Sequence, residues 1–353
     1  MSIRLLVTLG PSSLNKETIQ KLANEGVTLF RLNMSHTDLD VLPDLIKLVQ
    51  SSSDVPLCLD SEGAQIRNQN MDGGAVMFKT GETVKIHYDT VLGDANTISF
   101  TPKGIAKQLQ KGDRIRVDFD SMQLLVTELN DDHCLATVEQ GGKVGSNKAS
   151  DVDRYLKLDP ITPKDREAIK IGRQFNIKHF ALSFSDSRAS VDEMRSLTGE
   201  DTWIISKVES MPGLANLADI LDASDEVLID RGDLSRQVPL EKIPFVQRRI
   251  IAAGRSQGTP VAVATNLMES MIDSNLPTRA EINDVVSTLL MGANSLVLAA
   301  ETAVGQFPYE TVVMVKKLIS GFERWTPNNS MQEILNDETG NPGKYDLSYY
   351  RAS

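Results

Sequence analysis

The chain has 353 residues, 41% of them hydrophobic and 24% charged, which is an ordinary globular composition with room for one large domain and a smaller one. Its formal net charge of −11 argues against general nucleic-acid binding, so an anionic ligand would need a local positive pocket. Cys58 and Cys134 lie in apolar runs and are expected to be reduced core residues, and neither a zinc-type histidine spacing, a signal-peptide pattern nor a run of transmembrane length is found. We therefore expect a cytoplasmic protein with no nucleic-acid or membrane partner.

Short apolar runs alternate with amphipathic segments along most of the chain. The runs expected to form strands are residues 3–9, 29–34, 55–60, 179–184, 203–208, 226–230, 260–265 and 295–300. The segments expected to form helices include residues 16–25, 163–175, 214–223, 241–257 and 280–291. Pro163 and Pro308 fall near helix starts, where the missing N–H of proline is tolerated. Strands that are apolar on both faces and joined by helices predict an α/β fold, the (β/α)8 TIM barrel.

The segment from about Asn70 to Arg154 breaks this rhythm. It contains short alternating runs separated by turn signals, at residues 83–87, 97–100, 114–118, 123–129 and 134–139. This pattern predicts a small β-barrel domain of residues 70–154, inserted after the third strand of a barrel formed by residues 1–69 and 155–325. The chain is polar after Gly321 and is expected to be loose there, with residues 326–353 as a polar C-terminal tail.

Charged side chains follow two consecutive predicted strands in the second half of the chain. Lys207 and Glu209 stand two positions apart, so they leave their strand on the same side, and Asp233 follows the next strand. The carboxylate oxygens of Glu209 and Asp233 suit Mg²⁺ or Mn²⁺, which shares oxygens with a substrate. Lys207 is a compact positive charge suited to a developing oxyanion or a phosphoryl group in transfer. Together they predict chemistry on a phosphorylated oxyacid.

Further polar residues collect at the C-terminal ends of the predicted strands, where the reactive groups of such barrels lie. They are Arg31, Asn33, Ser35, His36, Asp60, Ser61, Arg67, Arg231, Gly232, Thr265, Asn266, Glu301 and Thr302. Gly232 lets a ligand approach the backbone, and Arg31 can hold a phosphate in its planar fork. Convergence from nearly every strand is stronger evidence than any single residue.

Each of these residues could also have a purely structural role. Lys207, Glu209 and Asp233 could form no more than a surface salt-bridge cluster. The structural roles open to the rim residues are an ion pair between Arg31 and Asp60, a helix cap at Ser35 or at Thr265, a capping or surface role for His36, a loop tether at Glu301, and packing of the methionines in residues 267–271.

Ordered motifs resemble those of the pyruvate kinase family from Thr8 to Pro308. They are residues 31–36 (RLNMSH), 206–209 (SKVE), 231–234 (RGDL), 264–271 (ATNLMESM), 277–281 (PTRAE) and 301–305 (ETAVG). Together these motifs are specific, although any one alone would be weak. The resemblance implies a barrel interrupted after its third strand by a small β domain. It also implies transfer of phosphate between phosphoenolpyruvate and ADP, giving pyruvate and ATP, with Mg²⁺ (or Mn²⁺) and K⁺.

The resemblance also implies residue roles. Lys207 would stabilise the phosphoryl group and the enolate oxygen, Arg31 would hold the phosphate, and Thr265 would take part in proton delivery. The divalent metal would bind Glu209 and Asp233, and the substrate carboxylate would bind the backbone around Gly232 and Asp233 together with Thr265. The remaining implied groups are Asn33, Ser35, Asp60 and Ser61 for the monovalent cation, His36, Arg67 and Lys148 for the nucleotide, and Glu301 in support.

The sequence departs from the family pattern in several places. We expect a short form of the family, without the C-terminal domain that carries an effector site and part of the oligomer contacts. Glu62 reverses the charge of a family lysine beside the nucleotide residues, which would disfavour a polyphosphate. Asp230 stands where the family has a small residue, and it adds negative charge near the metal or pairs with Arg231. Ser235 and Gln237 replace a glycine and an acidic residue.

Three functions remain open at this point. The first is a phosphoenolpyruvate-dependent phosphotransferase with ADP as the acceptor, and the second is a related enzyme on phosphoenolpyruvate or a pyruvate-like oxyacid with another acceptor or reaction. The third is a non-catalytic, phosphoenolpyruvate-binding regulator. Self-association through the barrel helices is a further expectation.

Overall fold

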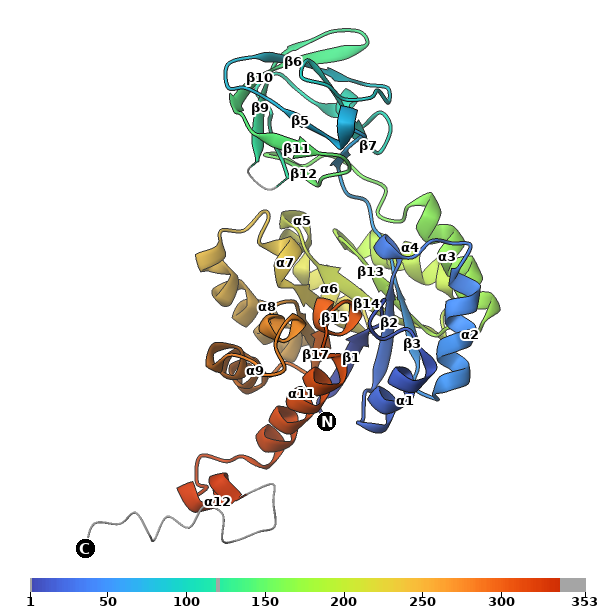
Figure 1. Ribbon diagram of the computed structural model, residues 1–353, viewed down its shortest axis with the longest axis vertical. Helices are drawn as coiled ribbons and strands as arrows, with labels where there is room; N and C mark the ends of the chain where they lie inside the picture. The colour runs from blue at the N-terminus through green and yellow to red at the C-terminus, as the bar shows by residue number, and fades with distance from the viewer. Residues whose placement is uncertain (1, 119–120, 337–353) are drawn as a thin grey trace, which may run out of the picture.

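Eight parallel strands close into a barrel in the computed structural model, which describes residues 2–118 and 121–336 (Figure 1). In chain order the strands are β1 (Arg4–Thr8), β2 (Leu29–Asn33), β3 (Leu57–Asp60), β13 (His179–Leu182), β14 (Trp203–Val208), β15 (Glu226–Asp230), β16 (Val261–Ala264) and β17 (Ser295–Leu298). Each strand pairs with its neighbours in the chain, and β17 closes the barrel against β1. The predicted TIM barrel and all of its predicted strands are confirmed.

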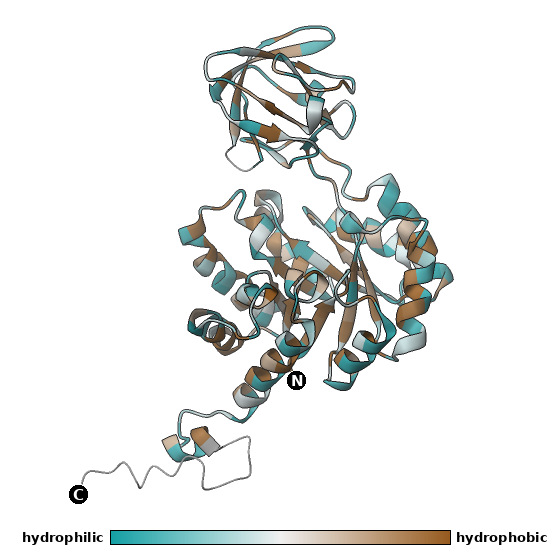
Figure 2. Cartoon of the chain, in the orientation of Figure 1, coloured by the Kyte–Doolittle hydropathy of each residue, from teal (hydrophilic) through white to brown (hydrophobic). Residues whose placement is uncertain are grey.

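Successive residues of a barrel strand point alternately to two apolar cores. In β14, Ile204 faces the core between the strands and the helices, whereas Ile205 faces the barrel interior, which is also lined by Leu6, Leu228 and Val297. Because side chains two apart share a face, Lys207 continues the interior row towards the C-terminal end of the barrel. Apolar residues (brown) accordingly run along the strands and the inner faces of the helices (Figure 2).

Helices surround the barrel between the strands. They are α1 (Lys16–Asn24), α2 (Leu42–Ser52), α3 (Pro163–Gln174), α4 (Arg188–Thr198), α5 (Met211–Ala215), α6 (Leu217–Ala223), α8 (Ile243–Gln257), α9 (Arg279–Met291) and α11 (Pro308–Arg324), with short α7 (Arg231–Leu234) and α10 (Ala300–Ala303). Pro163 and Pro308 are the first residues of their helices, as predicted. The helix predicted at residues 214–223 is interrupted at Asn216, between α5 and α6.

The chain after Gly321 is more regular than predicted. Helix α11 continues to Arg324, and α12 (Met331–Asn336) follows it. Both segments carry apolar residues among their polar ones, which favours helix over loose chain. The rest of the predicted tail, residues 337–353, lies outside the described residues.

A small β domain enters the chain between β3 and β13 and stands over the barrel (Figure 1). Its strands are β4 (Arg67–Asn68), β5 (Ala75–Met77), β6 (Thr83–His87), β7 (Thr97–Thr101), β8 (Arg114–Val117), β9 (Met122–Leu129), β10 (His133–Gln140), β11 (Lys143–Gly145) and β12 (Ser150–Val152). They form a seven-stranded and a two-stranded sheet around a separate apolar core. The predicted insertion after the third barrel strand is therefore confirmed.

The fold agrees with the expectation that the two cysteines are core residues. Cys58 lies inside the barrel and Cys134 in the core of the small domain, and both are buried and free, as expected. Within the two ranges that the structure describes, no helix has the length and apolar character needed to cross a membrane.

Candidate active site

Lys207 lies near the C-terminal end of β14, inside the barrel, and is 6% exposed. Its Nζ is 2.9 Å from Glu209 Oε1 and 3.4 Å from Asp60 Oδ2, and it donates a hydrogen bond of 3.1 Å to Ser183 Oγ. Burial alone lowers the pKa of Lys207, but Asp60, Glu209 and Asp230 together outweigh it and raise the pKa above its ordinary value. The ammonium therefore stays charged at neutral pH, suited to stabilising anions rather than acting as a base.

Arg31 and Asp60 meet beside Lys207, at the ends of β2 and β3. Arg31 Nη1 lies 2.9 Å from Asp60 Oδ2, and Arg31 Nε donates to Thr8 Oγ1 at 3.0 Å. The predicted Arg31–Asp60 ion pair is thus present. Nη1 is buried, and apart from this ion pair it has no hydrogen-bond partner among the residues that the structure describes. The arginine therefore keeps donor capacity for an anion at the rim.

Ser183 and Phe184, which follow β13, connect these groups and were not singled out from the sequence. Ser183 Oγ accepts from Lys207 and donates 2.7 Å to the carbonyl oxygen of Ser61. The Phe184 N–H donates to Glu209 Oε2 at 2.7 Å, and Phe184 has a φ of 52°, which is rare for a non-glycine residue. Their one sequence signal is their position just past a barrel strand, on the same rim as the predicted residues.

Three carboxylates come together next to Lys207. Glu209, Asp230 and Asp233 each offer one oxygen, and these oxygens all lie within 4.8 Å of one another. Glu209 and Asp230 are 1% and 7% exposed. Burial raises the pKa of Glu209 in spite of Lys207, and burial and then Asp230 raise the pKa of Asp233. Hard oxygen donors that repel one another in this way fit a divalent cation, because its charge offsets theirs.

Asp230 does not pair with Arg231, so that expectation is wrong. Arg231 points instead to the carbonyl oxygen of Thr265, to which its Nε and Nη2 donate at 3.1 and 2.5 Å, and its Nη1 lies 2.7 Å from Asp284 on α9. Asp230 Oδ2 lies 3.9 Å from Lys207 Nζ, and Asp230 Oδ1 has no hydrogen-bond partner within the described part of the chain. Asp230 therefore belongs to the carboxylate group.

Thr265 and Gly232 form the opposite side of the site. The Gly232 N–H donates to Thr265 Oγ1 at 2.9 Å, and that hydroxyl donates to the carbonyl oxygen of Ala264 at 2.6 Å. Thr265 and Asn266 have φ values of 66° and 55°, and a β-branched residue in this region is strained. Arg231 holds this strained turn through the Thr265 carbonyl group. The next helical turn, η5 (Glu269–Ile272), has Met268 at its N-cap, so a helix cap at Thr265 is the wrong interpretation.

The predicted monovalent-cation residues lie around β2 and β3. Asn33 is the direct neighbour of Asp60 across the two strands, and Asn33 Oδ1 accepts from the Ser35 N–H. Ser61 Oγ instead accepts from the Ser183 N–H. Ser35 lies in the 3-10 turn η1 (Met34–His36) and does not cap α2, which begins only at Leu42. A cation role for these four residues stays a prediction.

The predicted nucleotide residues lie outside the buried group formed by Lys207 and the carboxylates. His36 is exposed at the end of η1, whereas Arg67 and Lys148 belong to adjoining segments of the small domain, joined by the Asn68 N–H and the Lys148 carbonyl oxygen. Glu62, which was expected to repel a polyphosphate, lies 3.2 Å from Lys164 Nζ. That lysine offsets part of the reversed charge.

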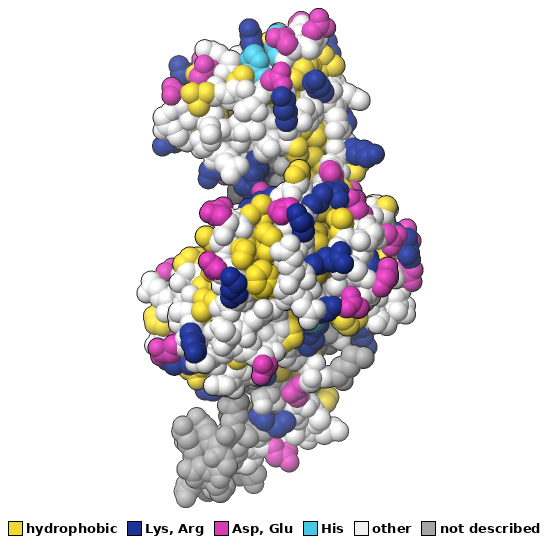
Figure 3. Space-filling view, turned by 90° about the vertical axis from the view of Figure 1, so that its right-hand side faces the viewer, with side chains coloured by type: hydrophobic (Ala, Val, Ile, Leu, Met, Phe, Trp, Pro, Cys, Tyr) yellow, Lys and Arg dark blue, Asp and Glu magenta, His cyan; other side chains and the backbone are white. Residues whose placement is uncertain are grey.

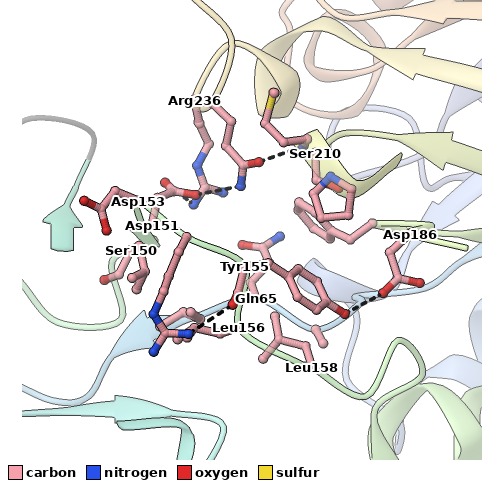
Figure 4. A pocket seen from close by; sticks show the side chains of 18 of the residues that line it. Gln65, Ser150, Asp151, Asp153, Tyr155, Leu156, Leu158, Asp186, Ser210 and Arg236 are labelled. Atoms are coloured by element: carbon pink, nitrogen blue, oxygen red, sulfur yellow. Dashed lines mark hydrogen bonds and ion pairs between the residues drawn. The ribbon is translucent and has the colours of Figure 1, made fainter. Parts of the chain in front are cut away.

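A cavity of about 540 Å³ lies between the small domain and the barrel (Figure 4). Its lining includes Arg116, Tyr155 and Phe184, but none of the predicted nucleotide residues. The lining includes Phe184, whose N–H donates to Glu209 Oε2, and Ser210, which follows Glu209 in the chain, so the cavity borders the carboxylate group. The molecule narrows at this level, where the small domain meets the barrel (Figure 3).

Side chains connect the small domain to the barrel across this cavity. Asp151 Oδ2 lies 3.0 Å from Arg236 Nη2, and Asp151 Oδ1 accepts from Gln237 Nε2 at 3.2 Å (Figure 4). Arg236 Nη1 also lies 3.3 Å from Asp233 Oδ1. Arg236 therefore joins a carboxylate of the site to the small domain.

Burial and contacts distinguish functional from purely structural roles for several of the predicted residues. Lys207 and Glu209 are buried, so they are not a surface salt-bridge cluster. Glu301 tethers loops, because its two oxygens accept from the N–H groups of Met268 and Ala299. Met268 and Met271 are fully buried, which confirms their packing role.

Comparisons with known sequences and structures point to one family. The family model described as pyruvate kinase, barrel domain, matches residues 2–312. A pyruvate kinase of Methylorubrum extorquens is 32% identical over 327 residues, covering 91% of this chain and 68% of the relative, and one of Thermotoga maritima is 32% identical over 333 residues, covering 92% and 71%. A solved pyruvate kinase structure from Cryptosporidium parvum superposes with a TM-score of 0.84 at 31% identity, covering 92% of this chain and 70% of that one.

Proposed function

The chain belongs to the pyruvate kinase family and is a pyruvate kinase-like enzyme, and on this premise we propose that it transfers the phosphoryl group of phosphoenolpyruvate to ADP. The observation that carries the proposal is the buried, charged Lys207 beside the carboxylates of Glu209, Asp230 and Asp233 at one end of the barrel. A fixed cation next to a divalent-metal site supports chemistry in which negative charge moves between oxygens.

In the proposed reaction the bond between phosphorus and the enol oxygen breaks, and a bond forms between phosphorus and an oxygen of ADP. Lys207 donates to the transferring group and to the enolate oxygen, and Arg31, which Asp60 holds through Nη1, binds the phosphate with its guanidinium group. A divalent ion on Glu209 and Asp233 would supply charge neutralisation at the same oxygens. The enolate then takes a proton at its methylene carbon and becomes pyruvate, with Thr265 on the side of proton delivery.

Several parts of the proposal rest on the family alone. They are Mg²⁺ or Mn²⁺ as the divalent ion, K⁺ at Asn33, Ser35, Asp60 and Ser61, the nucleotide at His36, Arg67 and Lys148, the substrate carboxylate at Gly232, Asp233 and Thr265, and a cytoplasmic location. Self-association through the barrel helices likewise stays a prediction.

A coupled assay for pyruvate tests the proposal. Phosphoenolpyruvate, ADP, Mg²⁺ and K⁺ are expected to give pyruvate, and Lys207→Ala is expected to lower kcat by roughly 100-fold or more. Circular dichroism and a thermal melt show whether the variant folds, since removing Lys207 leaves buried carboxylates unpaired. Lys207→Arg keeps the positive charge opposite the buried carboxylates. Comparing it with Lys207→Ala shows how much of the loss in kcat and in stability comes from removing the charge. Absence of pyruvate from the folded wild-type protein would sink the proposal.

One observation favours a second candidate, a related enzyme with an acceptor other than ADP. The cavity beside the carboxylate group is lined by Tyr155, Phe184 and Met211 and by none of the predicted nucleotide residues. Titration calorimetry separates the two candidates. Heat on adding ADP with phosphoenolpyruvate and Mg²⁺ present, from binding or from turnover, supports the first, whereas phosphoenolpyruvate binding with no heat from ADP supports the second.

A further inference from the structure

Asp230 occupies an unusual place in the site. It ends β15, three residues before Asp233, at a position where a small residue was expected from the resemblance. The residue is 7% exposed, and its Oδ1 is buried with no hydrogen-bond partner in residues 2–118 and 121–336. A buried carboxylate oxygen without a partner is costly, so the fold retains it against a penalty.

The neighbouring cationic side chains are directed mainly towards carboxylates other than Asp230. Lys207 lies closer to Glu209 and Asp60, at 2.9 and 3.4 Å, than to Asp230 Oδ2, at 3.9 Å. Arg231 is turned towards Asp284, and Arg236 towards Asp151 and Asp233. Asp230 therefore has the carboxylates of Glu209 and Asp233 as close neighbours, whereas Lys207, which pairs with its Oδ2 at 3.9 Å, is held nearer to Glu209 and Asp60.

We propose that Asp230 is a third carboxylate ligand of the divalent ion, in addition to Glu209 and Asp233, and that the free protein therefore binds the ion without substrate. The proposal rests on the metal site of the proposed function and adds a ligand to it. The three side chains offer oxygens within 4.8 Å of one another, close enough to share one ion. Mg²⁺ is more often held by one or two carboxylates, with substrate phosphates and waters as the other ligands.

The position of Asp230 Oδ1 also implies an order of binding. A Cβ built on Gly232 would lie 3.5 Å from this oxygen and 3.7 Å from Thr265 Oγ1, so Asp230 borders the backbone proposed to bind the substrate carboxylate. Two carboxylates this close repel each other unless a cation lies between them or beside them. The ion is therefore expected to bind before phosphoenolpyruvate.

Direct Mn²⁺ binding tests the inference without any assay of activity. The full chain is freed of metal with a chelator and titrated with Mn²⁺ alone, and free Mn²⁺ is followed by electron paramagnetic resonance. Asp230→Asn and Asp230→Ala are expected to raise the Kd by about tenfold or more, as for loss of a ligand or its close support. Asp192→Asn, which removes the same charge from an exposed position of α4, is expected to leave the Kd unchanged. Equal Mn²⁺ affinity of wild type and both Asp230 variants would overturn the inference.

Thermal melts give a second readout, because a metal ligand and a purely structural residue are expected to change Tm in different ways. Without metal, Asp230→Asn is expected to melt at the same or a higher temperature than the wild type, because a buried unpaired charge is removed. With Mn²⁺, the wild type gains more in Tm than the variant, because a tighter ligand stabilises more. A lower Tm without metal together with an undiminished Mn²⁺ gain would mean a structural role instead. Tight Mn²⁺ binding without pyruvate formation would contradict the proposed function and leave the third ligand standing.

Discussion

Arg231 shows how a single residue serves the site without facing the substrate. Its two hydrogen bonds to the Thr265 carbonyl group and its ion pair with Asp284 hold a threonine whose φ of 66° is unfavourable. A residue kept in such a conformation needs surrounding contacts that outweigh the strain. Arg231 is therefore a positioning residue for Thr265.

Arg231→Ala is expected to release the Thr265 turn and to lower kcat by roughly 10- to 100-fold, because small displacements at a reacting centre are costly. Steady-state kinetics of pyruvate formation, with kcat and KM resolved, is the measurement. Arg231→Lys keeps the pair with Asp284 but cannot donate two parallel hydrogen bonds, so it should give a smaller loss. Wild-type kcat in Arg231→Ala would contradict the positioning role, because the Thr265 turn would then keep its conformation without Arg231.

Several of these residues could be predicted from the sequence, but most of their contacts could not. The two-residue spacing of Lys207 and Glu209 places both on one side of β14, and the structure brings them within 2.9 Å. The direction of Arg231 depends on Asp284, which is distant in sequence and arrives on α9. Ser183 was missed because a lone serine carries no periodic signal. The chemical roles of all these residues remain predictions.

At the level of elements, strand position was well predicted and short strands were not. The barrel strands are apolar on both faces, and that pattern is visible without a structure. Strands β5, β11 and β12 have three residues each, too few to show alternation, and β4 has two. They are fixed by their partners in the sheets, so tertiary contacts rather than local sequence decide them.

The N-terminal ends of the barrel strands carry a buried charge of their own. Glu226, at the start of β15, is fully buried and accepts from Ser295 Oγ at 2.5 Å and from Arg4 Nη1 at 2.6 Å. These contacts tie β15 to β17 and to β1, across the closure of the barrel. Polar groups at this end of a barrel serve stability rather than chemistry.

Arg4→Ala is expected to lower the free energy of unfolding by about 3 kcal/mol, because it leaves Glu226 buried without its cation. Urea unfolding followed by circular dichroism is the measurement. The double variant Arg4→Ala with Glu226→Gln should recover part of the loss, since the charge itself is then removed. If the single and double variants were equally unstable, lost packing of the arginine stem would be the cause instead.

At the scale of the whole molecule, the small domain is connected to the barrel beside the site. Asp151 of the small domain contacts Arg236 and Gln237, and Arg116 donates to the carbonyl oxygen of Arg236 at 3.0 Å. Because Arg236 also contacts Asp233, the position of the small domain and the charge of the carboxylate group are linked through one side chain.

Asp151→Ala is expected to loosen the small domain, since it removes both contacts to Arg236 and Gln237. Limited proteolysis of the connecting segments, residues 61–66 and 153–162, should become several-fold faster, because cleavage follows the population of open forms. Asp72→Ala removes an exposed carboxylate of the same domain and serves as the control. Equal cleavage rates in wild type and Asp151→Ala would show that other contacts hold the domain.

The most direct test of phosphoryl transfer to ADP is ³¹P nuclear magnetic resonance of the purified protein with phosphoenolpyruvate, ADP, Mg²⁺ and K⁺. The phosphoenolpyruvate signal is expected to fall while the γ-phosphate signal of ATP rises by the same amount, and Lys207→Ala is expected to show neither change on the same time scale. Loss of the phosphoenolpyruvate signal without ATP, or no change with the folded wild-type protein, would contradict ADP as the acceptor.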